Sequence, residues 1–149
     1  MRAVIQRVLQ ASVQVDENPV ASIGRGLLIL AGFHESDTGN DMEYVAGKIL
    51  GVRIFDDADG VMNLSVADTG DEILLVPQFT LYGDARKGKR PSYSSAMESD
   101  AARAAFAAFF DLCRSMHEKT KAGVFGADMK VSLINDGPVT ILIDSSRLF

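Results

Sequence analysis

Two short segments contain the residues whose types and spacing could carry chemistry. The first is Asn135-Asp136-Gly137-Pro138-Val139-Thr140, which lies between two apolar runs. Proline fixes its own φ and lacks an N–H, and glycine reaches φ values closed to other residues. An X–Pro bond can also be cis at a cost of about 0.5–1 kcal/mol. Gly137-Pro138 could therefore aim two backbone carbonyls in a direction that an ordinary strand does not allow, although the dipeptide alone favours a tight turn.

The second segment is the run from Ile73 to Leu81, in which apolar residues lead to Pro77 and then to Gln78-Phe79-Thr80. This pattern predicts a buried strand that enters a polar loop. The Thr80 hydroxyl is a candidate nucleophile. Because no base stands beside it in the sequence, we favour a role in holding the loop.

Common catalytic motifs are absent from the sequence, including Gly-X-Ser-X-Gly, His-Glu-X-X-His, Cys-X-X-Cys and a phosphate loop. The only histidines are His34 and His117, and the only cysteine is Cys113. Their wide separation argues against a zinc site, so we expect no metal. His34 follows an apolar run and is a minor candidate for a base, because histidine titrates near neutral pH. Cys113 is expected to be a packing residue in a helix, and His117 to lie at that helix's end.

Taken together, the two segments resemble the D-aminoacyl-tRNA deacylase family. The family pattern is Ser-Gln-Phe-Thr-Leu at a strand end and Asn-X-Gly-Pro-Val-Thr near the C-terminus. The second motif is intact at Asn135 to Thr140, and the first is intact at Gln78 to Leu81, with Pro77 in place of the serine. The resemblance covers nearly the whole chain and includes Ile5-Gln6-Arg7-Val8, Ala11-Ser12-Val13, Gly51-Val52-Arg53-Ile54-Phe55, Met62-Asn63-Leu64-Ser65, Arg90-Pro91-Ser92 and Phe125-Gly126-Ala127-Asp128-Met129.

The resemblance implies a reaction that needs no cofactor. The substrate is the ester that joins a D-amino acid to the terminal ribose of a tRNA. Because this ester is already activated and the neighbouring 2′-hydroxyl can position a water, the protein needs mainly orientation and an oxyanion site. We expect the Phe79 N–H to supply that site, with Gln78 and Thr80 beside it.

The resemblance also implies how L-aminoacyl-tRNA is spared. A cis Gly137-Pro138 unit, inserted from the partner subunit of a homodimer, would point its carbonyls at the substrate and clash with an L side chain. Glycine on tRNA has no side chain and would be hard to exclude. Phe125 and Met129 match the segment that lines the terminal-adenosine pocket, where Phe125 can stack on the base, although it could instead be a core residue. Arg7 either braces the Gly-Pro loop or is only a surface charge.

Pro77 is the one departure from the family motif. Proline cannot donate a hydrogen bond, although it fits at a strand end. We interpret the substitution as a sign that the serine hydroxyl is dispensable, since a required nucleophile would leave this chain inactive. Two alternatives stay open. One is a non-catalytic module that binds a tRNA end or a nucleotide and has lost activity through Pro77. The other is a hydrolase of free D-amino-acid esters or peptides, for which no nucleophile–base pair is visible.

Composition limits the partners. The net charge is −5 and the pI is about 4.9, which argues against a broad duplex-binding surface, so we expect no DNA partner. However, Arg86, Lys87, Lys89 and Arg90 lie within five positions and are candidate RNA phosphate contacts, or else a solvated loop. The N-terminus lacks a signal-peptide pattern and the apolar run at 26–33 is too short to span a bilayer. With one cysteine, this predicts a cytoplasmic protein.

Apolar periodicity predicts the elements that must position these residues. Strands are expected at 4–15, 20–23, 27–31, 53–55, 73–80, 129–134 and 140–144. Asp41 is expected to cap one helix, and a second helix is expected at 100–118. The apolar face of the second helix is predicted to consist of Ala101, Ala104, Ala105, Ala108, Phe109, Leu112 and Met116. The aspartates at 56–59 predict a hairpin turn instead of a calcium loop, and 82–97 is expected to be a long polar loop.

These elements predict one α/β domain over residues 1–149, in which a mixed, barrel-like sheet is covered by two helices. The resemblance adds three layers and a homodimer.

Overall fold

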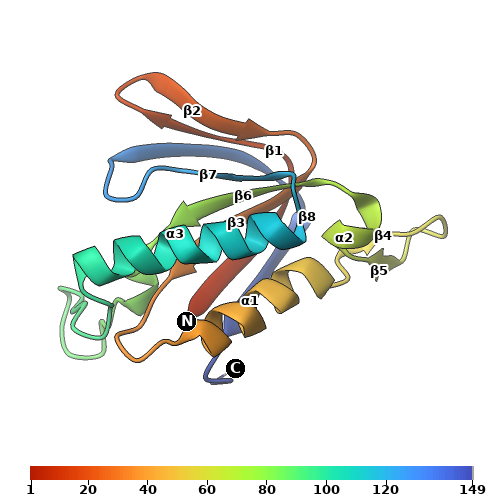
Figure 1. Cartoon of the computed structure of the whole chain (residues 1–149). Helices are drawn as coiled ribbons and strands as arrows, with labels where there is room; N and C mark the ends of the chain where they lie inside the picture. The colour runs from red at the N-terminus through yellow and green to blue at the C-terminus, as the bar shows by residue number, and fades with distance from the viewer. Residues whose placement is uncertain (149) are drawn as a thin grey trace.

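One sheet organises the chain, and a computed structural model describes it over residues 1–148. Figure 1 shows the sheet curling behind and above two helices. Its strands are β1 (Arg2–Val15), β2 (Asn18–Ile23), β3 (Gly26–Gly32), β6 (Glu72–Pro77), β7 (Thr120–Ala122) and β8 (Met129–Asp144), in the order β2-β1-β3-β6-β7, with β8 paired to β1. The β3–β6 and β6–β7 pairs are parallel and the others antiparallel, so the predicted mixed sheet is confirmed.

β1 is the strand around which the sheet bends. Residues 2–8 pair with β3 and residues 11–15 pair with β2, while β8 follows the other edge of β1 along its length. The upper halves of β1 and β8 therefore fold with β2 over one face of β3 and β6, as Figure 1 shows. This curling gives the sheet its nearly closed, barrel-like form.

Two helices cover the opposite face. They are α1 (Gly39–Gly51) and α3 (Ser99–Met116), and they lie side by side in front of the sheet in Figure 1. The remaining elements are short: β4 (Phe55–Asp56), β5 (Met62–Leu64), α2 (Val66–Thr69) and the 3-10 turn η1 (Phe79–Tyr82). Among residues 1–148, no helix is long and apolar enough to cross a membrane.

The core has two parts, one on each face of the central strands. The larger part lies under the helices and includes Ile5, Ile29, Ile49, Leu75 and Phe109, all fully buried. The smaller part lies inside the curl of the sheet and includes Val8, Val13, Ile23, Leu28, Leu74 and Val76. Helices, central strands and the folded-over strands thus form the three layers expected for this fold, and the fold class is confirmed.

Several sequence predictions were wrong in detail. α1 begins before Asp41: Thr38 is the N-cap, and Asp41 is the third helical residue that completes a capping box with it. The buried face of α3 is Ala102, Phe106, Phe109 and Cys113, whereas Ala101, Ala104, Ala108 and Met116 are exposed. In an alanine-rich helix many faces are apolar, and the large side chains decide which one is buried.

The strand boundaries also differ from prediction. β6 ends at Pro77, so Thr80 lies in η1 and not in the strand. Arg53 and Ile54 precede β4 and are outside it. β7 was not predicted, because a strand of three residues leaves too short a pattern. The two C-terminal strands are one strand, β8, which carries the Gly-Pro unit within it.

Candidate functional site

A cavity of about 650 Å³ opens at the carboxyl end of β6. Three segments form its walls: the strand end and η1, the start of α3 with the loop before it, and the segment that leads into β8. The lining residues are Val76, Pro77, Gln78, Phe79, Tyr93, Ala96, Met97, Glu98, Ser99, Ala102, Phe125, Gly126, Ala127, Asp128, Met129 and Val131. Its volume falls within the range of about 300–1,000 Å³ common for small-molecule sites.

The buried strand β6 presents the first wall. Leu74, Leu75 and Val76 are almost wholly buried and anchor the strand. Pro77 pairs with Ala31 of β3, and the Gln78 N–H then donates to the Ala31 carbonyl at 2.8 Å. After this last bond the chain turns sharply into η1, which leaves Phe79 58% exposed at the cavity. Proline is therefore accommodated at the end of β6, where the ladder stops.

The Phe79 N–H is available for a ligand. Phe79 is the first residue of η1, and the first N–H groups of a helical turn have no carbonyl of that turn to bond. The Phe79 ring contacts the Tyr93 ring edge to face, with centroids 5.1 Å apart. This aromatic pair lies among the lining residues of the cavity and joins its first wall to the loop before α3.

The Thr80 hydroxyl bonds to a side chain that is not a base. The Gln78 amide Nε2 donates to Thr80 Oγ1. Within residues 1–148, this is the one side-chain hydrogen bond of the Thr80 hydroxyl, and neither a histidine nor a carboxylate accepts its proton. The bond ties the strand end to η1. This arrangement fits a loop-holding role for Thr80, as the sequence favoured.

The segment before β8 forms the opposite wall. Phe125 is half-buried, and its ring lies 6.2 Å from that of Phe106 in the core. Gly126 has φ +79°, a value that lets the chain turn from Phe125 toward Met129. Met129 opens β8 and packs into the smaller core. The structure thus brings Phe125 and Met129 to the same cavity as Gln78 and Phe79, over 40 residues apart in sequence.

The Gly-Pro unit lies in a bulge of β8. Thr140 pairs with Gln6 and Asn135 with Val8, so residues 136–139 stand opposite Arg7 alone. Gly137 has φ +130° and the Gly137–Pro138 bond is cis. Asn135 closes the base of the bulge, since its side chain accepts from the Val139 N–H at 2.7 Å and donates to the Val139 carbonyl at 3.2 Å. Gly137 and Pro138 are both exposed.

Arg7 supports this bulge from beneath. Its side chain is 8% exposed and forms ion pairs with Asp136 at 3.2 Å and Asp56 at 3.5 Å. The guanidinium also donates to the carbonyls of Asp136 and Ile54. Arg7 is therefore buried and bonded to the loop, and it is not a surface charge.

The Gly-Pro bulge and the cavity lie at opposite ends of the central strands. Arg7 is level with Leu27 of β3 and Ile73 of β6, whereas Pro77 is level with Ala31. Four residues of strand separate the two levels, which is about 13 Å along the sheet, and β1 and β3 lie between them across it. Neither Gly137 nor Pro138 lines the cavity of its own chain.

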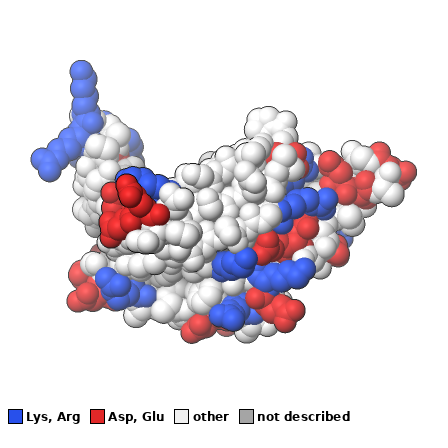
Figure 2. All heavy atoms as spheres, turned by 90° about the horizontal axis from the view of Figure 1, so that it is seen from above, with Lys and Arg blue, Asp and Glu red and all other residues white. Residues whose placement is uncertain are grey.

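The basic cluster lies on the loop that follows η1. All four basic residues are exposed. Arg86 forms an ion pair with Asp84 at 2.7 Å. Hydrogen bonds from Arg86 lower the pKa of the Asp84 carboxyl to about 2. Lys87, Lys89 and Arg90 form no ion pair within residues 1–148. Figure 2 shows a projection rich in Lys and Arg at the end of the molecule where this loop lies in Figure 1.

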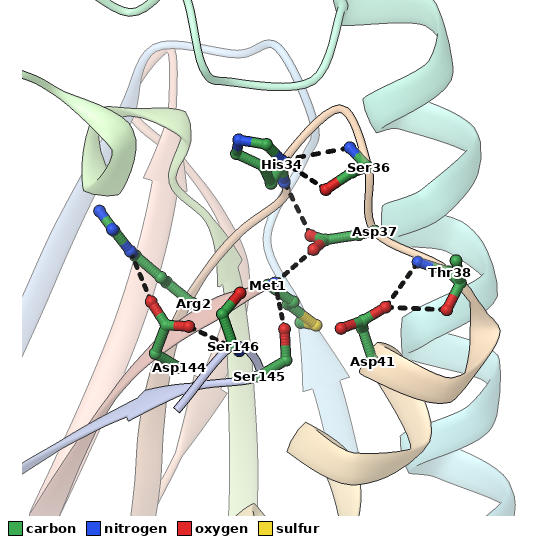
Figure 3. A network of polar contacts seen from close by, with 10 residues as sticks. All are labelled: Met1, Arg2, His34, Ser36, Asp37, Thr38, Asp41, Asp144, Ser145 and Ser146. Carbon is green, nitrogen blue, oxygen red and sulfur yellow. Dashed lines mark hydrogen bonds and ion pairs between the residues drawn. The ribbon is translucent and has the colours of Figure 1, made fainter. Parts of the chain in front are cut away.

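His34 lies outside the cavity. Figure 3 shows it with Arg2, Asp37 and Asp144 at the N-terminal end of β1. The His34 ring bonds to the Ser36 hydroxyl at 2.8 Å and lies 5.4 Å from the Tyr82 ring. Among the residues that the structure describes, its ring has no hydrogen bond to Gln78 or Thr80, so it is not placed as a base for them.

The other two residues with candidate chemistry are structural. Cys113 is a buried residue of α3, and burial raises the pKa of its thiol to about 12, which makes it a poor nucleophile. His117 is the C-cap of α3 and bonds to the Asp71 carbonyl at 2.7 Å, as expected for a helix end. Within residues 1–148, no group of three or more His, Cys, Asp or Glu side chains is placed to hold a metal ion.

Sequence reasoning missed one residue that lines the cavity and one that lies beside it. Tyr93 could have been noticed as an aromatic residue in an otherwise polar loop. Arg103 carried no signal, because an arginine on a helix is usually solvated. Here its guanidinium lies 5.0 Å from the centroid of the Phe125 ring.

Comparisons with known proteins agree over the whole chain. The family model described as D-Tyr-tRNA(Tyr) deacylase matches residues 4–144. Proteins named D-aminoacyl-tRNA deacylase are 53% identical in Thermotoga petrophila and 50% identical in Clostridium botulinum, over 149 residues and 100% of both chains in each case.

Two solved structures share the fold. The one named c-Myc DNA Unwinding Element Binding Protein is 41% identical, with a TM-score of 0.93 over 97% of this chain and 98% of that chain. A probable eukaryotic D-amino acid tRNA deacylase is 19% identical, with a TM-score of 0.84 over 95% of this chain and 97% of that chain, and is evidence of the fold alone.

Proposed function

This chain belongs to the D-Tyr-tRNA(Tyr) deacylase family, and from that premise we propose that it hydrolyses the ester between a D-amino acid and tRNA. The observation that carries the proposal is the convergence of the two family segments, Gln78-Phe79 and Phe125–Met129, on one cavity. We place the reaction in the cytoplasm, where aminoacyl-tRNA is used. The products are the free D-amino acid and tRNA.

The Phe79 N–H is the proposed oxyanion donor. It starts η1 without an intrahelical partner and belongs to a residue that lines the cavity. Water positioned by the ribose 2′-hydroxyl attacks the ester carbonyl, and the N–H stabilises the negative oxygen that forms. The Gln78–Thr80 hydrogen bond holds the strand end in place. No step requires a metal, a cofactor or the hydroxyl that Pro77 replaces.

Two variants of Phe79 distinguish the role of its backbone N–H from the role of its aromatic ring. Phe79→Pro removes the N–H at the first position of a helical turn, where proline is well tolerated. We expect a loss of about 100- to 1,000-fold in the rate of D-Tyr-tRNA hydrolysis, as for removal of one oxyanion donor. Phe79→Ala removes only the ring and should retain most of the rate constant. Equal rates for the proline and alanine variants would rule out this N–H as the donor.

Chiral selection is assigned to the Gly137-Pro138 bulge of a second subunit. Within one chain the bulge and the cavity are at opposite ends of the central strands, so a bulge that enters the cavity must come from another copy. Its carbonyls would occupy the space that an L side chain needs and leave room for hydrogen. Glycine on tRNA passes such a steric filter, so we propose that Gly-tRNA is also cleaved.

An apolar row across the sheet is suited to that dimer contact. Four apolar residues are paired in succession across β8, β1, β3 and β6, and their side chains share one face of the sheet. They are Leu142, Val4, Leu30 and Val76. Leu142 is 55% exposed at one end, and Val76 lines the cavity at the other. The row therefore leads from the strand that bears the bulge to the cavity, the path that a partner's bulge would follow.

A charge at Leu142 tests the dimer. Leu142→Asp should yield a monomer by light scattering and abolish selective hydrolysis, because it places a charge in the proposed interface. Val61→Asp, at an equally exposed apolar residue in the β4–β5 turn, is the matched control and should remain dimeric. A wild-type monomer that is fully active and selective would remove the composite site from the account.

The exposed cations after η1 are assigned to the RNA. Arg86 is neutralised by Asp84, so Lys87, Lys89 and Arg90 are the proposed phosphate contacts. This local cluster suits the end of one RNA better than a duplex, since the whole chain carries a charge of −5. DNA binding, which the name of one solved relative suggests, is the less favoured alternative for the same reason.

A further inference from the structure

The walls of the cavity differ in chemistry, and the third wall has no role in the proposed reaction. The acyl ester belongs at Gln78-Phe79 and the terminal base at Phe125–Met129. The start of α3 completes the cavity with Glu98, Ser99 and Ala102. An aminoacylated nucleotide has a third group besides its ester and its base, which is the phosphate on the ribose.

Arg103 is the cation next to this wall: it follows the lining residue Ala102 but is not itself one of the residues that line the cavity. It lies one turn beyond Ser99 on α3, is exposed, and spreads its guanidinium over the Phe125 ring at 5.0 Å. One of its N–H groups donates to the Phe125 carbonyl at 3.3 Å. A Cβ at Gly126 would lie 3.2 Å from Arg103 Nη2, so glycine at this position leaves the guanidinium its space. Arg103 is thereby fixed against the wall that holds the base.

The charges near Arg103 leave it unpaired. Asp128 pairs with Lys130 at 3.0 Å, and the Glu98 carboxylate accepts from the Asp100 N–H at the start of α3. Among the residues that the structure describes, Arg103 has no carboxylate partner within ion-pair distance. An arginine that is positioned by an aromatic ring and a carbonyl retains several N–H donors for a planar or tetrahedral anion.

We propose that Arg103 binds the phosphate of the terminal nucleotide while Phe125 faces its base. This assignment rests on the proposed function of the cavity and adds a substrate-binding residue to it. The consequence is that the site distinguishes a nucleotide from a nucleoside. A D-amino-acid ester of adenosine that lacks the phosphate should bind more weakly than the same ester of adenosine 5′-monophosphate.

The test compares adenosine with adenosine 5′-monophosphate, titrated into the protein and followed by NMR. The measured quantity is the ratio of the two Kd values in the wild type, in Arg103→Gln and in Arg114→Gln. Arg114 is the matched control, because it lies on the same helix and over another ring, at 5.9 Å, and that ring, Phe110, does not line the cavity as Phe125 does. Glutamine retains much of the side chain, so both variants should fold.

We expect the wild type and Arg114→Gln to prefer the monophosphate, and Arg103→Gln to reduce that preference by about fivefold, the upper end for one exposed charge contact. With D-Tyr-tRNA, Arg103→Gln should raise KM, leave kcat nearly unchanged, and lower the slope of log KM against log salt by about 0.7. Arg103→Lys should recover part of the preference.

Three results would overturn the proposal. The first is equal binding of both ligands by the wild type. The second is an equal loss of affinity for both ligands in Arg103→Gln, which would mean that Arg103 only supports the Phe125 wall. The third is a reduction of the preference in Arg114→Gln as large as that in Arg103→Gln. The proposed function is judged separately by hydrolysis of D-Tyr-tRNA. A wild type that leaves D-Tyr-tRNA intact but shows an Arg103-dependent preference would refute the hydrolase and retain the phosphate contact.

Discussion

Replacement of Arg7 by methionine tests whether the Gly-Pro bulge depends on its buried support. Methionine retains an unbranched apolar side chain and removes the guanidinium. Two carbonyls, of Ile54 and Asp136, then lose a charged donor. At about 1.5 kcal/mol each, the lower end for charged hydrogen bonds, the free energy of unfolding should fall by about 3 kcal/mol. The lost pairs with Asp56 and Asp136 add little, since both carboxylates are more than a third exposed.

For a chain of 149 residues this loss corresponds to a decrease in Tm of about 6–12 °C. The variant should also lose discrimination between D-Tyr-tRNA and L-Tyr-tRNA below its Tm, because residues 136–139 would no longer be held. Arg53→Met is the matched control, since Arg53 is exposed and only weakly bonded to Asn63 at 3.5 Å. An Arg7→Met protein with the Tm and the selectivity of the wild type would refute the reasoning.

Three further predictions address the strand end, the helix cap and metal dependence. Thr80→Val should slow D-Tyr-tRNA hydrolysis by about fivefold, the equivalent of one hydrogen bond of about 1 kcal/mol, and a trapped D-aminoacyl adduct on Thr80 would contradict this. Hydrogen bonds from Thr38 lower the pKa of Asp41 to about 2. The ionised Asp41 carboxylate therefore contributes fully to stability above about pH 4, and this contribution is lost as pH falls toward 2. Asp41→Asn should be less stable than wild type in urea at pH 7 and equally stable near pH 2. EDTA should leave hydrolysis unchanged, and loss of activity with recovery on adding zinc would contradict the proposed metal-free reaction.

The sequence predicted the parts of the fold that depend on local pattern. The continuous apolar runs around Leu27 and Leu74 predicted central strands without any information from the rest of the chain, and both strands are buried on both faces. The α3 face was mispredicted because alanine is apolar but small, and burial is decided by Phe106 and Phe109. The tight turn that the dipeptide alone favoured at Gly137-Pro138 is instead a bulge, since both flanking runs pair with the same long strand, β1.

The candidate site was only partly readable from sequence. Gln78, Phe79, Phe125 and Met129 were selected by resemblance, and the cavity brings them together. The register of the sheet, which sequence did not predict, places Gly137-Pro138 at the other end of the central strands. The role of Arg103 depends on contacts between α3 and the segment before β8, which no local pattern encodes.

Parallel hydrolysis assays with D-Tyr-tRNA and L-Tyr-tRNA test the central claim most directly, with wild type, Gly137→Ala and Gly39→Ala. At Gly137, where φ is +130°, a Cβ would lie 2.7 Å from Val139 Cγ2, so alanine must displace the bulge; at Gly39 a Cβ meets nothing within 4 Å. We predict that wild type and Gly39→Ala cleave only the D-ester. Gly137→Ala should cleave the L-ester as well or lose activity on both. A wild type that cleaves both esters at the same rate, or a Gly137→Ala protein unchanged on both, would contradict the account.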